Sequence, residues 1–171
     1  MNFFDLFNLP TDFDLDQNAL DNQLRVLQSL HHPDVQTDRA VQAKAEQMSA
    51  LINHAYQTLK FPDSRAVHLL ELVGQAYDLS QSIRDLDFLD LAMDLRIELD
   101  EASALDLPIL IEKLKLWIND ISKQFHQAYK QQDWQTAVVL TQKLKFLLKI
   151  DKDIAKKMNE LAKLNDDDLY V

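Results

Sequence analysis

A row of leucines at helical spacing, ended by a proline, sets the outline of the first part of this chain. The leucines recur every three or four residues within residues 20–30 and therefore share one face of an α-helix. Pro33 has no backbone N–H and restricts the residue before it, so this helix should end near His31. The polar tripeptide His32-Pro33-Asp34 is then expected on a loop, where it is free to contact a partner.

A second row of apolar residues at helical spacing follows the loop, over residues 41–59. The two helices are expected to form an antiparallel hairpin. Aromatic residues within residues 3–9 should pack against it, and residues 66–73 should form a short helix that ends at Gly74, which is suited to a C-terminal cap. We expect these elements to form a first domain over residues 1–75.

The composition favours an all-α fold. The chain has 171 residues, of which 47% are hydrophobic, enough for packed cores, and it contains one glycine and four prolines. So few turn-forming residues leave little room for β-hairpins. The sequence contains no cysteine, which excludes disulfides, Cys-based zinc sites and thiolate ligands for an iron-sulfur cluster. We expect no resident cofactor and no metal site.

The charge of the chain indicates protein partners. The formal net charge is −10, whereas binding to nucleic acid or to an anionic membrane needs a positive surface. No apolar run approaches the length of a membrane span, and the N-terminus lacks the pattern of a secretory signal. We therefore expect a cytoplasmic protein that binds neither nucleic acid nor membrane.

Residues 76–83 are weakly periodic and are predicted to be a linker. Residues 84–171 are expected to form a second domain, a three-helix bundle whose helices span about 84–104, 108–130 and 134–164. The third helix is rich in lysine. We expect its lysines to face solvent and to offset the acidic first helix of the bundle.

The first helix of the expected bundle carries apolar residues on two nearly opposite sides. One side is expected to form the core and consists of Phe88, Leu91, Leu95, Leu99 and Ala102. The other side consists of Leu86, Leu89, Met93 and Ile97. One three-helix core cannot cover both sides, so the second side should either bind a partner protein or pack against the first domain.

Acidic residues border this second side, namely Asp90, Asp94 and Glu101. An apolar strip with a charged rim is typical of a protein-binding site. Phe146 falls away from the buried face predicted for the third helix, and we expect it to be exposed and to extend the same surface.

Several motifs together resemble a known family. The tripeptide His32-Pro33-Asp34 is similar to the signature of J-domains, with which co-chaperones address DnaK-class ATPases. The order of the other motifs agrees: Phe3-Phe4-Asp5-Leu6-Phe7-Asn8-Leu9-Pro10 before the first helix, then Ile52-Asn53-His54-Ala55-Tyr56-Gln57-Thr58-Leu59, Pro62, Arg65-Ala66, Leu69-Leu70 and Gly74. With about a hundred further helical residues, the chain resembles HscB, the J-type co-chaperone of iron-sulfur cluster assembly, over nearly its whole length.

The resemblance implies a chaperone-binding site on the loop. His32, Pro33 and Asp34 would dock on a DnaK-class chaperone of the HscA type and promote ATP hydrolysis. Arg25 would belong to the basic face that J-domains usually display on the helix before the loop. That helix has no other basic residue here, so docking should depend more on the loop than on electrostatic steering.

The resemblance also implies a site for the iron-sulfur cluster scaffold protein, of the IscU type. In the family, the positions that match Leu89, Met93, Asp94, Glu101 and Phe146 contact this scaffold. Two further positions of the predicted site, Asp90 and Ile97, differ from the usual pattern, because an apolar Met often stands at the first and an acid at the second.

Two other functions stay open at this point. The same bundle could bind a different client protein and deliver it to the chaperone. Alternatively, His31, His32 and Asp34 could belong to a metal-dependent enzyme. No second polar cluster or nucleophile accompanies these three residues at a useful spacing, so we expect no catalytic site in this chain.

Overall fold

The structure is a computed structural model that describes residues 1–31, 39–75 and 83–167. Every regular element in these ranges is a helix, which confirms the all-α prediction. The chain divides into two compact units, Met1–Ala76 and Tyr77–Val171, and each is described separately below. Apart from Ile83, the predicted linker at 76–83 lies outside the described residues. None of the helices in the described ranges is long and apolar enough to cross a membrane.

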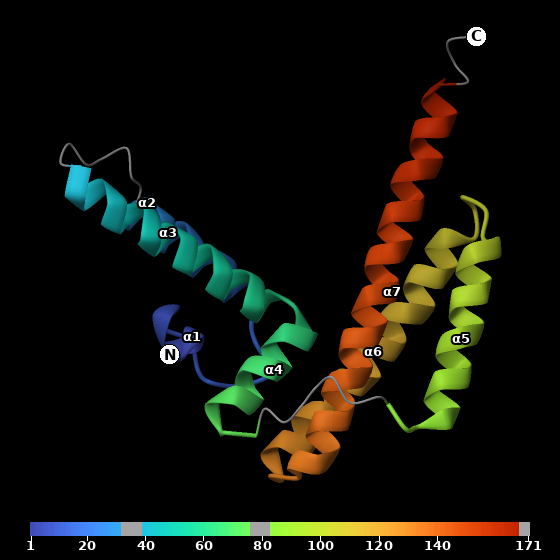
Figure 1. Cartoon of the computed structure of the whole chain (residues 1–171), viewed down its shortest axis with the longest axis horizontal. Coiled ribbons are helices and arrows are strands. Elements are labelled where there is room, and N and C mark those ends of the chain that lie inside the picture. Colours follow the sequence, from blue (N-terminus) through green and yellow to red (C-terminus); the bar gives the residue numbers. More distant parts are fainter. Residues whose placement is uncertain (32–38, 76–82, 168–171) are drawn as a thin grey trace. The chain divides into compact units, whose positions relative to one another are not determined.

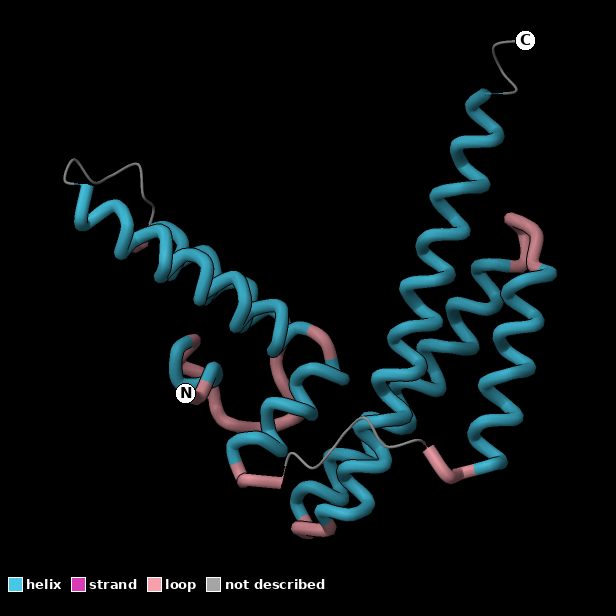
Figure 2. The backbone as a smooth tube through the Cα atoms, in the orientation of Figure 1, coloured by secondary structure: helices cyan, strands magenta, loops and turns pink. Residues whose placement is uncertain are grey.

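The first unit contains the helices α1 (Phe3–Leu6), α2 (Gln17–Leu30), α3 (Arg39–Lys60) and α4 (Pro62–Leu72). Figures 1 and 2 show α2 and α3 running along one another, with α4 turning away at the end of α3. The carboxylate of Asp16 accepts hydrogen bonds from two backbone N–H groups at the start of α2, which satisfies donors that a helix leaves free. His31 caps the other end of α2, as the position of Pro33 predicts.

The core of the first unit is apolar. Its fully buried side chains are Phe4, Phe7, Leu20, Ile52, Ala55, Leu59, Ala66, Leu69 and Leu70. The aromatic residues of the N-terminal segment thus pack with α3 and α4, as expected. Leu30 is an exception, because 69% of it is exposed. At 100° per residue it has turned about 80° away from the side of α2 that Leu20 occupies.

The guanidinium of Arg65 joins three segments of this unit. Its Nε donates to the Leu59 carbonyl at 2.7 Å, and another nitrogen donates to the Phe13 carbonyl at 2.6 Å. A third donates to the Lys60 carbonyl at 3.2 Å. The bonds to Leu59 and Lys60 satisfy carbonyls at the C-terminal end of α3, which have no partner within the helix. Burial lowers the pKa of Arg65 to about 10, so the side chain stays protonated at neutral pH.

His68 anchors α1 to α4. It is buried, and its Nε2 accepts the backbone N–H of Phe3 at 3.1 Å, while the Phe3 ring stacks on the imidazole at 4.4 Å. Its Nδ1 lies 3.6 Å from a carboxylate oxygen of Glu71. An Nε2 that accepts a hydrogen bond carries no proton, so the folded protein holds His68 in its neutral form.

Side-chain hydrogen bonds also join α2 to α3. The Tyr56 hydroxyl donates to the carboxylate of Asp21 at 3.0 Å, and the Gln17 amide donates to the same oxygen. Both hydrogen bonds lower the pKa of Asp21, and the bond from Gln17 has the larger effect. Nearer the C-terminal end of α2, the amide of Gln28 donates to Asn53 at 3.2 Å. These bonds therefore fix α2 and α3 to one another.

The second unit is the three-helix bundle that the sequence predicts. Its helices are α5 (Leu86–Glu101), α6 (Leu107–Lys130) and α7 (Trp134–Asp167). The most extensive packing is between α6 and α7, and α5 contacts both (Figure 1). The core side chains of α6 and α7 are Leu107, Leu110, Leu114, Ile121, Phe125, Ala128, Ala137, Leu140, Leu144, Leu147, Leu148, Ile150 and Ile154.

The hydrogen bonds of Arg65 lead to a first prediction. Arg65→Ala removes the buried hydrogen bonds from the guanidinium to the Leu59 and Phe13 carbonyls, which should destabilise the first unit by about 3 kcal/mol. Thermal unfolding followed by far-UV circular dichroism should begin at a lower temperature. Tryptophan fluorescence reports on the second unit, because both tryptophans lie in α6 and α7, and that transition should move less. Equal shifts of both signals would contradict the prediction.

A second prediction concerns pH. Burial, partly opposed by Glu71, lowers the pKa of His68 below its usual 6.5. Below about pH 6.5 the unfolded chain therefore binds a proton that the folded protein does not, and stability is lost as the pH falls toward the folded pKa. Protection of the α4 amides against hydrogen exchange, relative to their intrinsic rates at each pH, should fall between pH 7 and pH 5. His68→Gln should remove this fall, and an unchanged slope in that variant would rule out His68 as the cause.

Candidate functional site

The candidate scaffold-binding site is built on α5, whose first turn is fixed by a carboxylate. Asp85 is the N-cap, and its side chain accepts the backbone N–H of Phe88 at 3.0 Å. The ammonium group of Lys143, on α7, donates to the same carboxylate. Both bonds lower the pKa of Asp85, and the bond from Lys143 has the larger effect. The start of α5 is thereby tied to α7.

The inner side of α5 is narrower than the sequence analysis predicts. Its buried residues are Phe88, Ala92, Leu95 and Leu99. Leu91, predicted to be in the core, is 58% exposed, and Ala92 is fully buried. Residues 88, 92, 95 and 99 follow the spacing of a single stripe, and Leu91 lies about 100° from Ala92. The small side chain of Ala92 suits a side on which α5 meets neighbouring helices.

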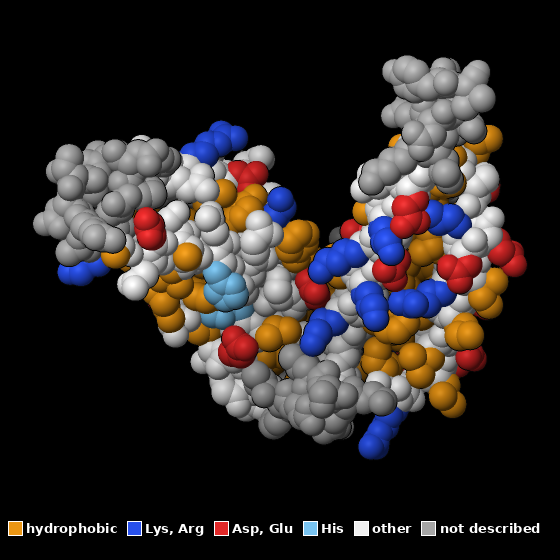
Figure 3. Space-filling model, turned by 45° about the horizontal axis from the view of Figure 1, so that its top comes forward, with side chains coloured by type: hydrophobic (Ala, Val, Ile, Leu, Met, Phe, Trp, Pro, Cys, Tyr) orange, Lys and Arg blue, Asp and Glu red, His pale blue; other side chains and the backbone are white. Residues whose placement is uncertain are grey.

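Within the second unit, the outer side of α5 is not covered by α6 or α7. The exposed fractions are 72% for Leu86, 64% for Met93 and 47% for Ile97. Leu89 is half-buried. In Figure 3, hydrophobic, acidic and basic side chains lie close to one another on the surface of the second unit. An exposed apolar patch rimmed by charged residues is typical of an interaction surface.

Acidic side chains surround these apolar residues. Asp90, Asp94 and Glu101 are exposed, and among the described residues none of them forms an ion pair. Glu98 differs, because the ammonium of Lys113 on α6 donates to both of its carboxylate oxygens, at 2.7 and 2.8 Å. The negative charge that remains available for a partner is therefore concentrated beside Met93 and Ile97.

Phe146 of α7 lies next to α5. Its ring centroid is 5.9 Å from that of Phe88 in an edge-to-face arrangement, and the guanidinium of Arg96 lies over it at 5.5 Å. Arg96 also pairs with Asp153 of α7 at 3.4 Å. Phe146 is therefore half-buried beside α5, whereas the sequence predicts an exposed side chain. The predicted site combines residues from both helices.

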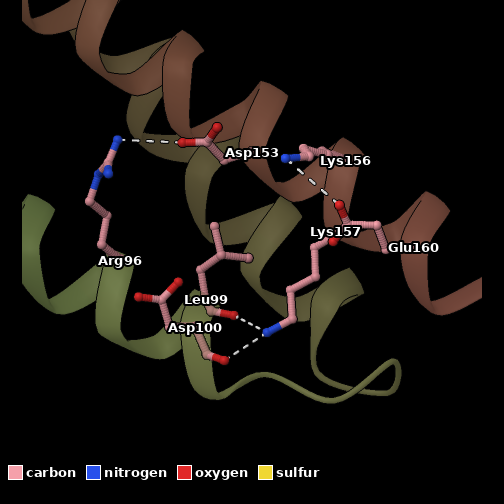
Figure 4. A pocket seen from close by; sticks show the side chains of 7 residues that line it. All are labelled: Arg96, Leu99, Asp100, Asp153, Lys156, Lys157 and Glu160. Carbon is pink, nitrogen blue, oxygen red and sulfur yellow. Dashed lines mark hydrogen bonds and ion pairs between the residues drawn. The ribbon is translucent and has the colours of Figure 1, made fainter.

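The C-terminal end of α5 is also tied to α7. The ammonium of Lys157 donates to the backbone carbonyls of Leu99 and Asp100, the second at 2.8 Å. A cavity of about 360 Å³ lies beside these bonds (Figure 4), and its lining residues are Arg96, Leu99, Asp100, Asp153, Lys156, Lys157 and Glu160. Three acidic and three basic side chains line it, so it presents no excess charge. The expectation that the lysines of this helix face solvent is wrong for Lys143 and Lys157.

The candidate chaperone-binding site is only partly visible. His32, Pro33 and Asp34 lie outside the described residues. Arg25 is exposed on α2, as its predicted role requires. The structure adds two exposed apolar residues on the same helix, Val26 at 52% and Leu30. The leucine spacing predicts Leu30 on the packing face of the helix, and no sequence pattern marks Val26.

The metal-enzyme alternative needs a group of side chains that could hold an ion. Within residues 1–31, 39–75 and 83–167, no three His, Cys, Asp or Glu side chains come together in a group that could hold an ion. Of the three residues in the metal-enzyme alternative, only His31 is described. Its backbone N–H donates to the Leu27 carbonyl at 3.1 Å and completes the last turn of α2.

The sequence is similar to those of named co-chaperones over nearly its full length. Residues 84–155 match the model of the family described as the HSCB C-terminal oligomerisation domain. A co-chaperone protein HscB homolog from Acinetobacter baylyi is 39% identical over 162 residues, which are 94% of this chain and 93% of that protein. A homolog from Shewanella amazonensis is 36% identical over 165 residues, covering 90% of this chain and 95% of its own.

The fold is similar to those of solved co-chaperones as well. The chaperone HscB from Vibrio cholerae superimposes with a TM-score of 0.76 at 34% identity, covering 94% of this chain and 99% of that one. The human co-chaperone protein HscB superimposes with a TM-score of 0.80 at 27% identity, covering 92% and 82% of the two chains. Both units of the structure therefore have counterparts in these proteins.

Proposed function

Because this chain belongs to the HscB family of co-chaperones, we propose that it stimulates the ATPase of a DnaK-class chaperone of the HscA type and delivers an iron-sulfur cluster scaffold of the IscU type to it. The observation that carries this proposal is full-length similarity to HscB proteins combined with the tripeptide His32-Pro33-Asp34 between α2 and α3. The protein has no catalytic site of its own in this scheme.

The first unit supplies the contact with the chaperone, through His32, Pro33, Asp34 and Arg25. Asp34 offers a carboxylate to a basic group of the chaperone, and His32 and Pro33 contribute shape and hydrogen bonding. The bonds that join α2 to α3 support this role, because Tyr56–Asp21 and Gln28–Asn53 hold together the two helices that flank the tripeptide in the sequence. A binding segment between two fixed helices loses less conformational entropy when it binds.

The second unit supplies the contact with the scaffold, through Leu89, Asp90, Met93, Asp94, Ile97, Glu101 and Phe146. The exposed apolar residues of α5 would form the centre of the interface and the three acids its rim. Since the acids are free of internal ion pairs in the described ranges, the matching surface of the scaffold should be basic. The cluster itself is cargo of the scaffold, in keeping with a chain that has no cysteine.

The two contacts act together. A protein that binds the chaperone with one unit and the scaffold with the other raises the effective concentration of the scaffold at the chaperone. The loop favours the conformation of the chaperone in which ATP hydrolysis accompanies capture of the client. Both effects would promote cluster transfer to recipient proteins.

Steady-state ATPase rates of the chaperone test the first contact. Addition of this protein should raise the rate, and addition of the scaffold as well should raise it further. His32→Gln should abolish the stimulation while leaving the helical circular dichroism signal unchanged, because the substituted residue lies outside α2 and α3. Arg25→Ala should lower the stimulation only slightly at physiological salt, since a single exposed charge mainly affects association. Full stimulation by His32→Gln would refute the assignment of the loop.

Affinity for the scaffold tests the second contact. The double variant Leu89→Ala/Met93→Ala should bind the scaffold about tenfold to thirtyfold more weakly by calorimetry, because it truncates the apolar centre of the interface. Ile109→Ala/Leu116→Ala is the matched control, since both side chains are 70% exposed on α6, outside the proposed site. The control should bind like the wild type. Similar losses in both variants would mean that the interface is not on α5.

A further inference from the structure

Lys143 and Lys157 of α7 contact opposite ends of α5. Lys143 donates to the N-cap carboxylate of Asp85, and only 13% of its side chain is exposed. Lys157 donates to the Leu99 and Asp100 carbonyls in the last turn (Figure 4). The distance spanned between these contacts is about four helical turns, which is nearly the whole of α5. The two lysines therefore hold α5 at its start and at its end.

The contacts between the two helices keep one register. Asp85 and Lys143 are 58 residues apart in the chain, and so are Leu99 and Lys157. The aromatic pair of Phe88 and Phe146 lies between these contacts and follows the same alignment. Arg96 and Asp153, 57 residues apart, lie between them as well. Such a constant offset means that α5 and α7 run in the same direction without sliding along one another.

We infer that Lys143 and Lys157 are positioning residues for scaffold binding: they fix α5 against α7 so that Leu89 and Met93 form one surface with Phe146. This inference rests on the proposed function, because it concerns the same surface. A shift of one helical turn along α7 would move Met93 by about 5.4 Å relative to Phe146 and divide the surface. Neither lysine belongs to the surface itself.

The chemistry of the helix ends explains why lysine is suited to this role. The last carbonyls of a helix have no partner within it and carry partial negative charge. Glu98, Asp100 and Glu101 add further negative charge there, and α5 has no basic residue in its last turn. Lys157 supplies the missing cation from the neighbouring helix. At the other end, Lys143 neutralises the carboxylate that caps the helix.

The test compares Lys143→Met/Lys157→Met with two other double variants of the full-length protein. Methionine keeps much of the aliphatic stem and removes the charge. Lys145→Met/Lys152→Met is the matched control, because these lysines are exposed on the same helix and form no ion pair within the described ranges. Lys143→Arg/Lys157→Arg keeps both cations. Scaffold affinity, amide hydrogen exchange in α5 and scaffold-free ATPase stimulation are measured for each.

We expect the methionine pair at 143 and 157 to weaken scaffold binding about tenfold and to accelerate exchange in α5 more than in α6. The control pair should match the wild type, and the arginine pair should recover most of the affinity. ATPase stimulation without scaffold should not change. In a protein that already carries Leu89→Ala/Met93→Ala, the methionine pair should cause little further loss, because the surface is already incomplete.

Two results would overturn the inference. One is exchange in α5 that stays as slow as in the wild type, since the lysines would then not hold the helix. The other is faster exchange with unchanged scaffold affinity, since the lysines would then stabilise α5 without positioning the site. A wild-type protein that does not bind the scaffold would contradict the proposed function instead, and the exchange rates would still decide whether the lysines hold α5.

Discussion

The attachment of α5 to the pair formed by α6 and α7 is the constraint on which the second unit depends. Only four residues of α5 are buried, and one of them is an alanine. Burial of a large apolar side chain contributes about 1.5–3 kcal/mol to the free energy of folding. Three such side chains therefore attach α5 to the bundle only moderately. Hydrophobic contact is also non-directional and sets the register of two helices weakly. The directional bonds at the ends of α5 supply that register, and its outer side can therefore stay exposed.

The ends of the helices were predictable because local chemistry determines them. Pro33 and the helical leucine spacing place the end of α2 correctly, and Gly74 has the positive φ of 70° that a residue after a helix often adopts. The assignment of inner and outer sides was less certain. Leu91 is more hydrophobic than Ala92, and the sequence pattern favours it for the core. In the bundle Ala92 is buried instead, because a small side chain fits where the helices approach closely.

The contacts of Lys143 and Lys157 could not be predicted from the sequence. A lysine on a helix surface is solvated in most cases, and its long side chain reaches a partner only when two helices have a defined register. That register is a tertiary property which no local pattern contains. Arg65 illustrates the same limit in the first unit. The motifs identify it as a family residue, whereas its hydrogen bonds to Leu59 and Phe13 follow from the packing of α3, α4 and the N-terminal segment.

The internal ion pairs also determine which charges remain for partners. The chain has 18 basic and 28 acidic residues. Each internal ion pair therefore uses a larger share of the basic side chains than of the acidic ones. Lys143, Lys113 and Arg96 are used within the second unit, against Asp85, Glu98 and Asp153. Asp90, Asp94 and Glu101 form no ion pair within the described residues, and they lie beside the exposed apolar residues of α5. The bonds that hold α5 thus involve the carboxylates of Asp85 and Glu98 and the carbonyls of its last turn, and they leave its outer acids to attract a basic partner at long range.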